Sequence, residues 1–147
     1  MTSRSARPGR RRVRGIVAAL LVLAAGGCAG QGPSFEPTPG TQVLVRTELY
    51  FGRLKPDGAV VTDAEWRAFA AEAITPRFPD GFTVFDALGQ YRGRDGQIVS
   101  EPTKVLLIVH ETDARRRGAV QELRDLYRRR FQQESVLLIE SPARAGF

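Results

Sequence analysis

The sequence predicts a single α+β domain whose secondary-structure elements follow the order β-α-β-β-α-β. Three observations lead to this fold class. Four stretches between residues 43 and 141 have the alternation or the apolar composition of strands. Two further segments carry apolar residues at helical spacing. Turn sequences that contain Pro, Asp and Gly separate several of these elements.

The first predicted strand is Val43–Phe51, and a loop with the turn Pro56-Asp57-Gly58 follows it. Successive side chains of a strand point to opposite faces of the sheet. The strand therefore presents two sets, with Thr47, Leu49 and Phe51 on one face and Glu48 and Tyr50 on the other.

The clearest helix start of the chain follows at Thr62. Thr62 can cap the helix, and Glu65 three residues later can complete a capping box. Val61 can pack against Trp66 as a hydrophobic staple. Pro76 disfavours helical geometry at Thr75, so the helix should end there. The buried stripe of this helix consists of Trp66, Phe69, Ala70, Ala73 and Ile74.

A tight turn is expected at 78–82, where proline presets φ and glycine takes a conformation that other residues resist. Strand 82–92 follows. Val84 and Asp86 lie on one face of it, and Thr83, Phe85 and Ala87 lie on the other. It should form a hairpin with 97–100 through Asp95-Gly96. Pro102 cannot donate to a sheet, so we expect a bulge or a new start there. The strand Thr103–Glu111 is the most apolar and should be central.

A second helix should run from Thr112 or Asp113 to about Gln132. Asp125 is placed to pair with Arg129 one turn later. The last strand is expected at Ser135–Ser141, followed by a tail at 143–147. The buried stripe of the second helix is Val120, Leu123, Tyr127 and Phe131.

This element order is the split βαβ, or ferredoxin-like, arrangement. It predicts a four-stranded antiparallel sheet in the order 4-1-3-2 with both helices on one face. Domains of this kind often form homodimers through the uncovered face of the sheet. The fold hosts many unrelated functions and therefore indicates no activity by itself.

The positive charge of the chain is confined to its first residues. Six arginines before position 15 account for the whole formal net charge of +6, and the first acidic residue is Glu36. The remainder is formally neutral. We therefore expect no nucleic-acid partner.

Residues 1–27 have the organisation of a signal peptide. A basic segment precedes an apolar core, 16–25, which suits an export signal and is short for a bilayer span. The sequence 23–28, LAAGGC, resembles the lipobox of bacterial lipoproteins. That resemblance implies cleavage before Cys28, acylation of Cys28 and attachment to the cell envelope through a lipid anchor, on the periplasmic side. Ala29 after the cysteine favours the outer membrane over the inner. The alternatives are an ordinary secreted protein with an incidental Cys28 and, from Arg11-Arg12, twin-arginine export.

Cys28 is the only cysteine, so the folded part cannot form an internal disulfide or a thiolate zinc site. We find no Gly-rich phosphate loop and no metal-ligand spacing, and we expect no cofactor and no metal. Residues 28–41 are rich in Gly and Pro and predict a flexible tether. The single folded domain should span 42–142.

Part of the chain, roughly Thr47–His110, resembles a bacterial family of unknown function, DUF3574, many of whose members are lipoproteins by their sequence. Tyr91 stands where that family has tryptophan. The resemblance implies no catalytic residue. It is carried by Glu48-Leu49-Tyr50-Phe51-Gly52, Trp66, Thr75-Pro76-Arg77-Phe78-Pro79-Asp80-Gly81, Thr83, Gly89-Gln90, Glu101, Lys104 and Val105.

One set of polar residues stands within apolar strands or beside the central turn. A structural interpretation is that Arg77 and Asp80 brace the turn while Glu101 and Lys104 pair with each other. A functional interpretation is a shallow polar cleft at the turn that binds a small ligand or an envelope protein. The candidate surface consists of Glu48, Tyr50, Arg77, Asp80, Gln90, Glu101, Lys104 and His110.

These observations favour a non-enzymatic binding module over an enzyme. The alternative is a small acid-base enzyme of the dimeric α+β-barrel kind, with His110, Tyr50 or Glu48 as acid or base. Geometry distinguishes the two. A concave pocket lined by these three side chains together favours the enzyme, whereas scattered side chains and a groove only at 77–81 favour the binding module.

Overall fold

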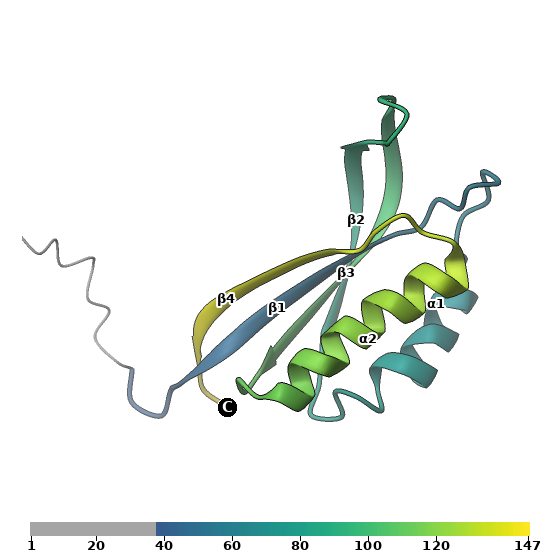
Figure 1. The fold of residues 1–147 in the computed structure, drawn as a ribbon. Helices are drawn as coiled ribbons and strands as arrows, with labels where there is room; N and C mark the ends of the chain where they lie inside the picture. Colours follow the sequence, from purple (N-terminus) through teal and green to yellow (C-terminus); the bar gives the residue numbers. More distant parts are fainter. Residues whose placement is uncertain (1–37) are drawn as a thin grey trace, which may run out of the picture. The chain divides into compact units, whose positions relative to one another are not determined.

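The computed structural model describes residues 38–147 (Figure 1). The predicted leader, Cys28 and residues 29–37 of the predicted tether lie outside the described residues. The elements, in chain order, are β1 (Gln42–Gly52), α1 (Asp63–Phe69), β2 (Thr83–Arg92), β3 (Ile98–His110), α2 (Ala114–Phe131) and β4 (Leu137–Ala145). A π-helical segment, Ala70–Ile74, continues α1. The predicted order of elements is confirmed.

The strands form one antiparallel sheet in the order β2-β3-β1-β4, which is the predicted order read from the opposite edge. Both helices cover the same face of this sheet (Figure 1). No helix of residues 38–147 covers the other face, which we call the open face. The protein therefore has the predicted ferredoxin-like fold.

Helix α1 begins at the predicted capping box. Thr62 Oγ1 accepts a hydrogen bond from the Glu65 backbone N–H at 3.2 Å, and Glu65 Oε2 accepts one from the Thr62 N–H at 2.7 Å. Two backbone donors of the first turn are thereby satisfied. The helical segment ends at Ile74, next to the expected end, and the Thr75 N–H bonds to Ala70 O at 2.9 Å. Thr75 itself has helical φ and ψ of −53° and −44°, so the expected effect of Pro76 on its geometry is wrong.

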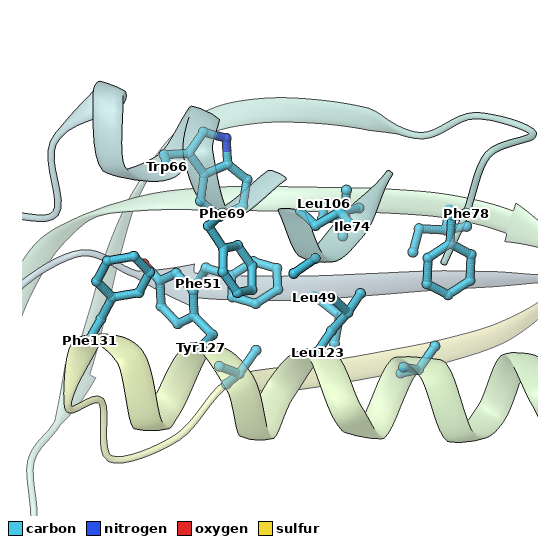
Figure 2. Close-up of a cluster of buried hydrophobic side chains, with 14 of the residues drawn as sticks. Leu49, Phe51, Trp66, Phe69, Ile74, Phe78, Leu106, Leu123, Tyr127 and Phe131 are labelled. Atoms are coloured by element: carbon cyan, nitrogen blue, oxygen red, sulfur yellow. The ribbon is translucent and has the colours of Figure 1, made fainter. Parts of the chain in front are cut away.

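The core lies between the helices and the sheet and is dominated by aromatic rings. Figure 2 shows Phe51 of β1 facing Trp66, Phe69 and Tyr127 from the two helices. The ring centroids of Phe51 and Tyr127 are 4.6 Å apart, and those of Tyr127 and Phe131 are 4.7 Å apart. The Tyr127 hydroxyl donates to the Gly52 carbonyl at 2.9 Å, which satisfies the polar end of a buried ring. The predicted stripes of both helices therefore build this core.

Strand β3 runs without a break through Pro102, so the expected bulge or new start is wrong. Leu88 lies opposite Pro102 in a regular register. The Pro102 carbonyl accepts from the Arg53 N–H at 3.0 Å, on the β1 side of the strand. The backbone N and O of one residue in an antiparallel strand point to the same side. The nitrogen of Pro102, which carries no hydrogen, therefore also points away from β2. No hydrogen bond to β2 is therefore lost.

Strand β4 begins later and ends later than predicted. It continues past Ser141 through Pro142, and Ala143–Ala145 pair with Gln42–Leu44 of β1. The expected tail at 143–147 is therefore largely strand. Pro142 is compatible with this because β4 is an edge strand.

Helix α2 begins after Asp113, whose side chain accepts from the Arg116 N–H at 2.7 Å. The predicted start is therefore confirmed. The expected ion pair of Asp125 with Arg129 is wrong, because Asp125 pairs with Arg128 at 3.4 Å. Residues three apart on a helix are neighbours as much as those four apart.

Candidate functional site

The two faces of the sheet separate the candidate residues. On β1, Thr47 is fully buried on the helix-covered face, in line with Leu49 and Phe51. Glu48 and Tyr50 alternate with these residues and lie on the open face. Cross-strand partners share a face, and His110 lies opposite Val45, which places His110 on the helix-covered face.

Beneath the central turn is a cavity of about 540 Å³ that we call the turn hollow. Gly81 has φ of 130°, a left-handed conformation that explains glycine in the Pro-Asp-Gly sequence. The turn hollow is lined by residues 77–83 of the turn, 107–111 at the end of β3, Arg115, Arg116 and Ala119 of α2, and Gln42, Leu44 and Phe147.

Arg77 and Asp80 connect the turn to helix α2. Arg77 Nη1 donates to the Ala73 carbonyl at 2.9 Å, and its Nε lies 3.1 Å from Glu122. Asp80 lies 3.5 Å from Arg116. These contacts agree with the expectation that both residues brace the turn, and both also line the turn hollow.

His110 lines the same hollow and is only 6% exposed. Its Nδ1 lies 2.8 Å from the carbonyl of Glu111, which can only accept, so Nδ1 carries a proton. Its Nε2 lies 2.9 Å from Thr47 Oγ1, which is also 3.3 Å from Glu140 Oε1. The hydroxyl of Thr47 has one proton, which it can donate either to His110 Nε2 or to Glu140 Oε1. If it serves Glu140, the histidine must donate from both nitrogens and carry a positive charge.

A second cavity, of about 320 Å³, lies beside the open face, and we call it the sheet hollow. Tyr50, Gln90 and Glu101 line it, together with Gly52, Gly89, Tyr91, Thr103, Gln133, Glu134, Ser135 and Leu137. Glu48 lies next to it, because Tyr50 Oη donates to Glu48 Oε2 at 2.6 Å. This hydrogen bond raises the pKa of the Tyr50 phenol, with burial adding to it.

Glu101 is 5% exposed, and its Oε2 accepts from the Leu54 N–H at 2.8 Å. Burial raises the pKa of this carboxyl, and the hydrogen bonds from the backbone of Leu54 and Arg53 oppose the shift. The expected pairing of Glu101 with Lys104 is wrong. Glu101 and Lys104 are three residues apart in one strand and therefore point to opposite faces.

Lys104 instead bridges two carboxylates on the helix-covered face. It forms ion pairs with Asp86, its cross-strand neighbour, and with Asp63 at the start of α1. Lys104 lines neither hollow. The candidate set thus divides into Arg77, Asp80 and His110 at the turn hollow, Tyr50, Gln90 and Glu101 at the sheet hollow with Glu48 beside it, and Lys104 apart from both.

Sequence reasoning did not identify Arg116, Thr47 or Glu140 as parts of the turn region. Thr47 carried a usable signal, because a hydroxyl on the buried face of a strand requires a hydrogen-bond partner. The sequence around Arg116 gave no such signal, because three arginines in succession are typical of a solvated helix face.

Within residues 38–147, no group of three His, Cys, Asp or Glu side chains is arranged to hold a metal ion. None of the helices in this part of the chain is long and apolar enough to cross a membrane.

Comparison with known proteins gives a family and a fold. Residues 46–147 match the model of a protein family of unknown function, DUF3574. No curated protein matches the chain. Among solved structures, a phage SAM lyase in complex with S-methyl-5'-thioadenosine is 18% identical with a TM-score of 0.57, covering 77% of this chain and 95% of the lyase. CutA from Synechococcus elongatus is 13% identical with a TM-score of 0.47, covering 71% of this chain and 86% of CutA.

Proposed function

The chain belongs to the DUF3574 family of proteins of unknown function, and we propose that it is an exported, lipid-anchored protein of the bacterial envelope that binds a ligand in the turn hollow. The leader and Cys28 support the location. The observation that carries the binding function is the hollow itself, where the turn, the end of β3 and the start of α2 meet around a buried histidine.

The charges at the turn hollow favour a ligand with an acidic group. Three arginines line it, Arg77, Arg115 and Arg116, against the two acids Asp80 and Glu111. Arg116 is already paired with both acids, whereas no carboxylate of residues 38–147 forms an ion pair with Arg115. An arginine side chain offers a planar set of donors that matches a carboxylate. The ligand is therefore a small acid or a peptide segment with an acidic side chain or terminus.

The alternative of an acid-base enzyme lacks the required arrangement. Tyr50 and Glu48 lie on the open face, and His110 lies on the helix-covered face. A general acid or base must come within hydrogen-bond reach of the reacting group. His110 therefore cannot act together with the Tyr50–Glu48 pair on one molecule bound to this domain, and this separation supports binding as the proposed function. The likeness to the phage SAM lyase concerns the fold, and we transfer neither its ligand nor its reaction.

Binding in the turn hollow is tested by replacing Arg77 and Asp80 together with alanine. Protein with both substitutions should retain less of its partner from an envelope extract, because it loses the Arg77 guanidinium, a donor for the acidic ligand at the rim of the hollow. Retained proteins and small molecules are identified by mass spectrometry. The matched control is Glu72→Ala with Arg130→Ala, which removes an exposed ion pair of 2.6 Å away from the hollow. A folded Arg77→Ala, Asp80→Ala variant that retains every partner contradicts the assignment.

Lipid anchoring is tested by replacing Cys28 with serine. The wild-type protein should incorporate a radioactive fatty acid in growing cells, and the Cys28→Ser variant should incorporate none, because Cys28 is the only thiol in the chain. Stable anchoring requires two or more acyl chains, so the label should accompany the membrane fraction. An immunoblot controls for equal amounts of the two proteins. Equal label in both variants overturns the lipid anchor.

A further inference from the structure

Two glycines contribute to the shape of the sheet hollow. Gly52 lies in β1 and Gly89 in β2, on either side of β3. A Cβ at Gly52 would lie 2.3 Å from Glu101 Oε1, and a Cβ at Gly89 would lie 2.7 Å from Thr103 Oγ1. Neither distance can be accommodated without a shift. The glycines therefore leave room in which the Glu101 and Thr103 side chains lie across the sheet and form part of the wall of the hollow.

The hollow is acidic. Two carboxylates line it, Glu101 and Glu134, and none of its described lining residues is Lys, Arg or His. The only ion pair of Glu134 within residues 38–147 is with Arg94 at 3.5 Å, and Arg94 is 80% exposed, so water screens this pair. The pKa of the Tyr91 phenol is raised, first by burial and then by Glu101, Glu134 and Asp95. Tyr91 therefore stands in a negative field.

The same hollow contains two aromatic rings. Tyr91 is 43% exposed, and Tyr50 lies on the open face with its hydroxyl already donated to Glu48. The face of a tyrosine ring attracts a cation, and the attraction grows where water is excluded. A carboxylate that is 5% exposed, beside two tyrosines, suits a positive charge that is weakly hydrated.

We propose that the sheet hollow binds a small organic cation, namely an ammonium group carried on a small molecule. Its volume of about 320 Å³ is at the lower end of the range for small-molecule sites. The site is distinct from the turn hollow, because the two hollows share no lining residue and take residues from opposite ends of β3, and it holds a ligand of opposite charge.

The test compares choline with 3,3-dimethylbutan-1-ol, which has the same shape without the charge. Both are titrated into the ¹⁵N-labelled full chain, and amide chemical shifts are followed. Choline should shift the amides of Gly52, Gly89 and Thr103 with saturation, and the alcohol should leave them unchanged. Equal shifts with the alcohol, shifts without saturation, or shifts located elsewhere overturn the proposal.

Two variants assign the binding to named groups. Glu101→Gln keeps the shape and the acceptor for Leu54, and it should weaken choline binding about tenfold by removing the charge. Tyr91→Leu should weaken it severalfold by removing the ring. The control Glu72→Gln removes an exposed carboxylate on the helical side and should bind like the wild type. Unchanged affinity in both test variants overturns the site. The Arg77→Ala, Asp80→Ala variant should bind choline normally, so failure of the turn-hollow assignment does not affect this result.

Discussion

Replacing Phe51 with alanine should cost about 3–5 kcal/mol of the free energy of unfolding. Phe51 is fully buried, and its ring packs against Trp66, Phe69 and Tyr127 (Figure 2). Truncation removes the buried ring and leaves a cavity that rigid neighbouring rings cannot fill. Domains of this size are stable by about 5–15 kcal/mol, so the variant should lose a large share of its stability. Urea denaturation measures the change.

The matched control is Phe85→Ala. Phe85 is also a phenylalanine in a strand, but it is 51% exposed on the open face. Its loss should cost less than about 1 kcal/mol, because half of the ring is already in contact with water. Equal destabilisation by both substitutions contradicts the placement of the core between the helices and the sheet.

The second large effect is expected at Gly52, where alanine should cost about 1–3 kcal/mol. The added Cβ would meet the Glu101 carboxylate, which is buried and accepts from the Leu54 N–H. Either the carboxylate moves and loses this hydrogen bond, or the strand shifts. The midpoint of thermal or urea denaturation reports the loss.

A double-mutant cycle distinguishes this clash from destabilisation by alanine that does not depend on Glu101. With Glu101 already changed to alanine, Gly52→Ala should cost clearly less, since the clash is gone. Gly118→Ala is the control glycine, because it lies within α2 and an added Cβ there meets no atom within 4 Å. It should stabilise the protein by about 0.5–1 kcal/mol. Strict additivity of the Gly52 and Glu101 changes contradicts the steric account.

The features that sequence reasoning predicted correctly depend on residues close together in the chain. The capping box at Thr62 and Glu65 requires only a spacing of three. The burial of Thr47, Leu49 and Phe51 follows from alternation along one strand. The order of elements then leaves few sheet arrangements, and the ferredoxin-like one is correct.

The features that sequence reasoning missed depend on which residues lie opposite one another on neighbouring strands. The extension of β3 past Pro102 and of β4 past Pro142 depends on the direction of each backbone group and on which strand is at the edge. Lys104 meets Asp86 because the register places them opposite. One error was avoidable, because residues three apart in a strand cannot share a face, which separates Glu101 from Lys104.

The hollows could not be predicted from spacing at all. The turn hollow joins segments that are far apart in the chain, namely the start of β1, the turn at 77–83, the end of β3, the start of α2 and Phe147. Part of the wall of the sheet hollow depends on two glycines, whose missing side chains leave room for Glu101 and Thr103. Gly52 and Gly89 are among the residues that resemble the family. That resemblance did not indicate that these glycines make room for other side chains.

Ligand binding in the turn hollow is tested most directly by photo-cross-linking in intact bacteria. A photoreactive amino acid replaces Asp80 in one variant and Asp57 in the other. Both positions are the aspartate of an exposed Pro-Asp-Gly turn, and only Asp80 lines the turn hollow. Irradiation at position 80 should give a defined adduct, seen as a mass increase, that Arg115→Ala reduces, and position 57 should give none. The same adducts from both positions, or none from position 80, would contradict binding in the turn hollow.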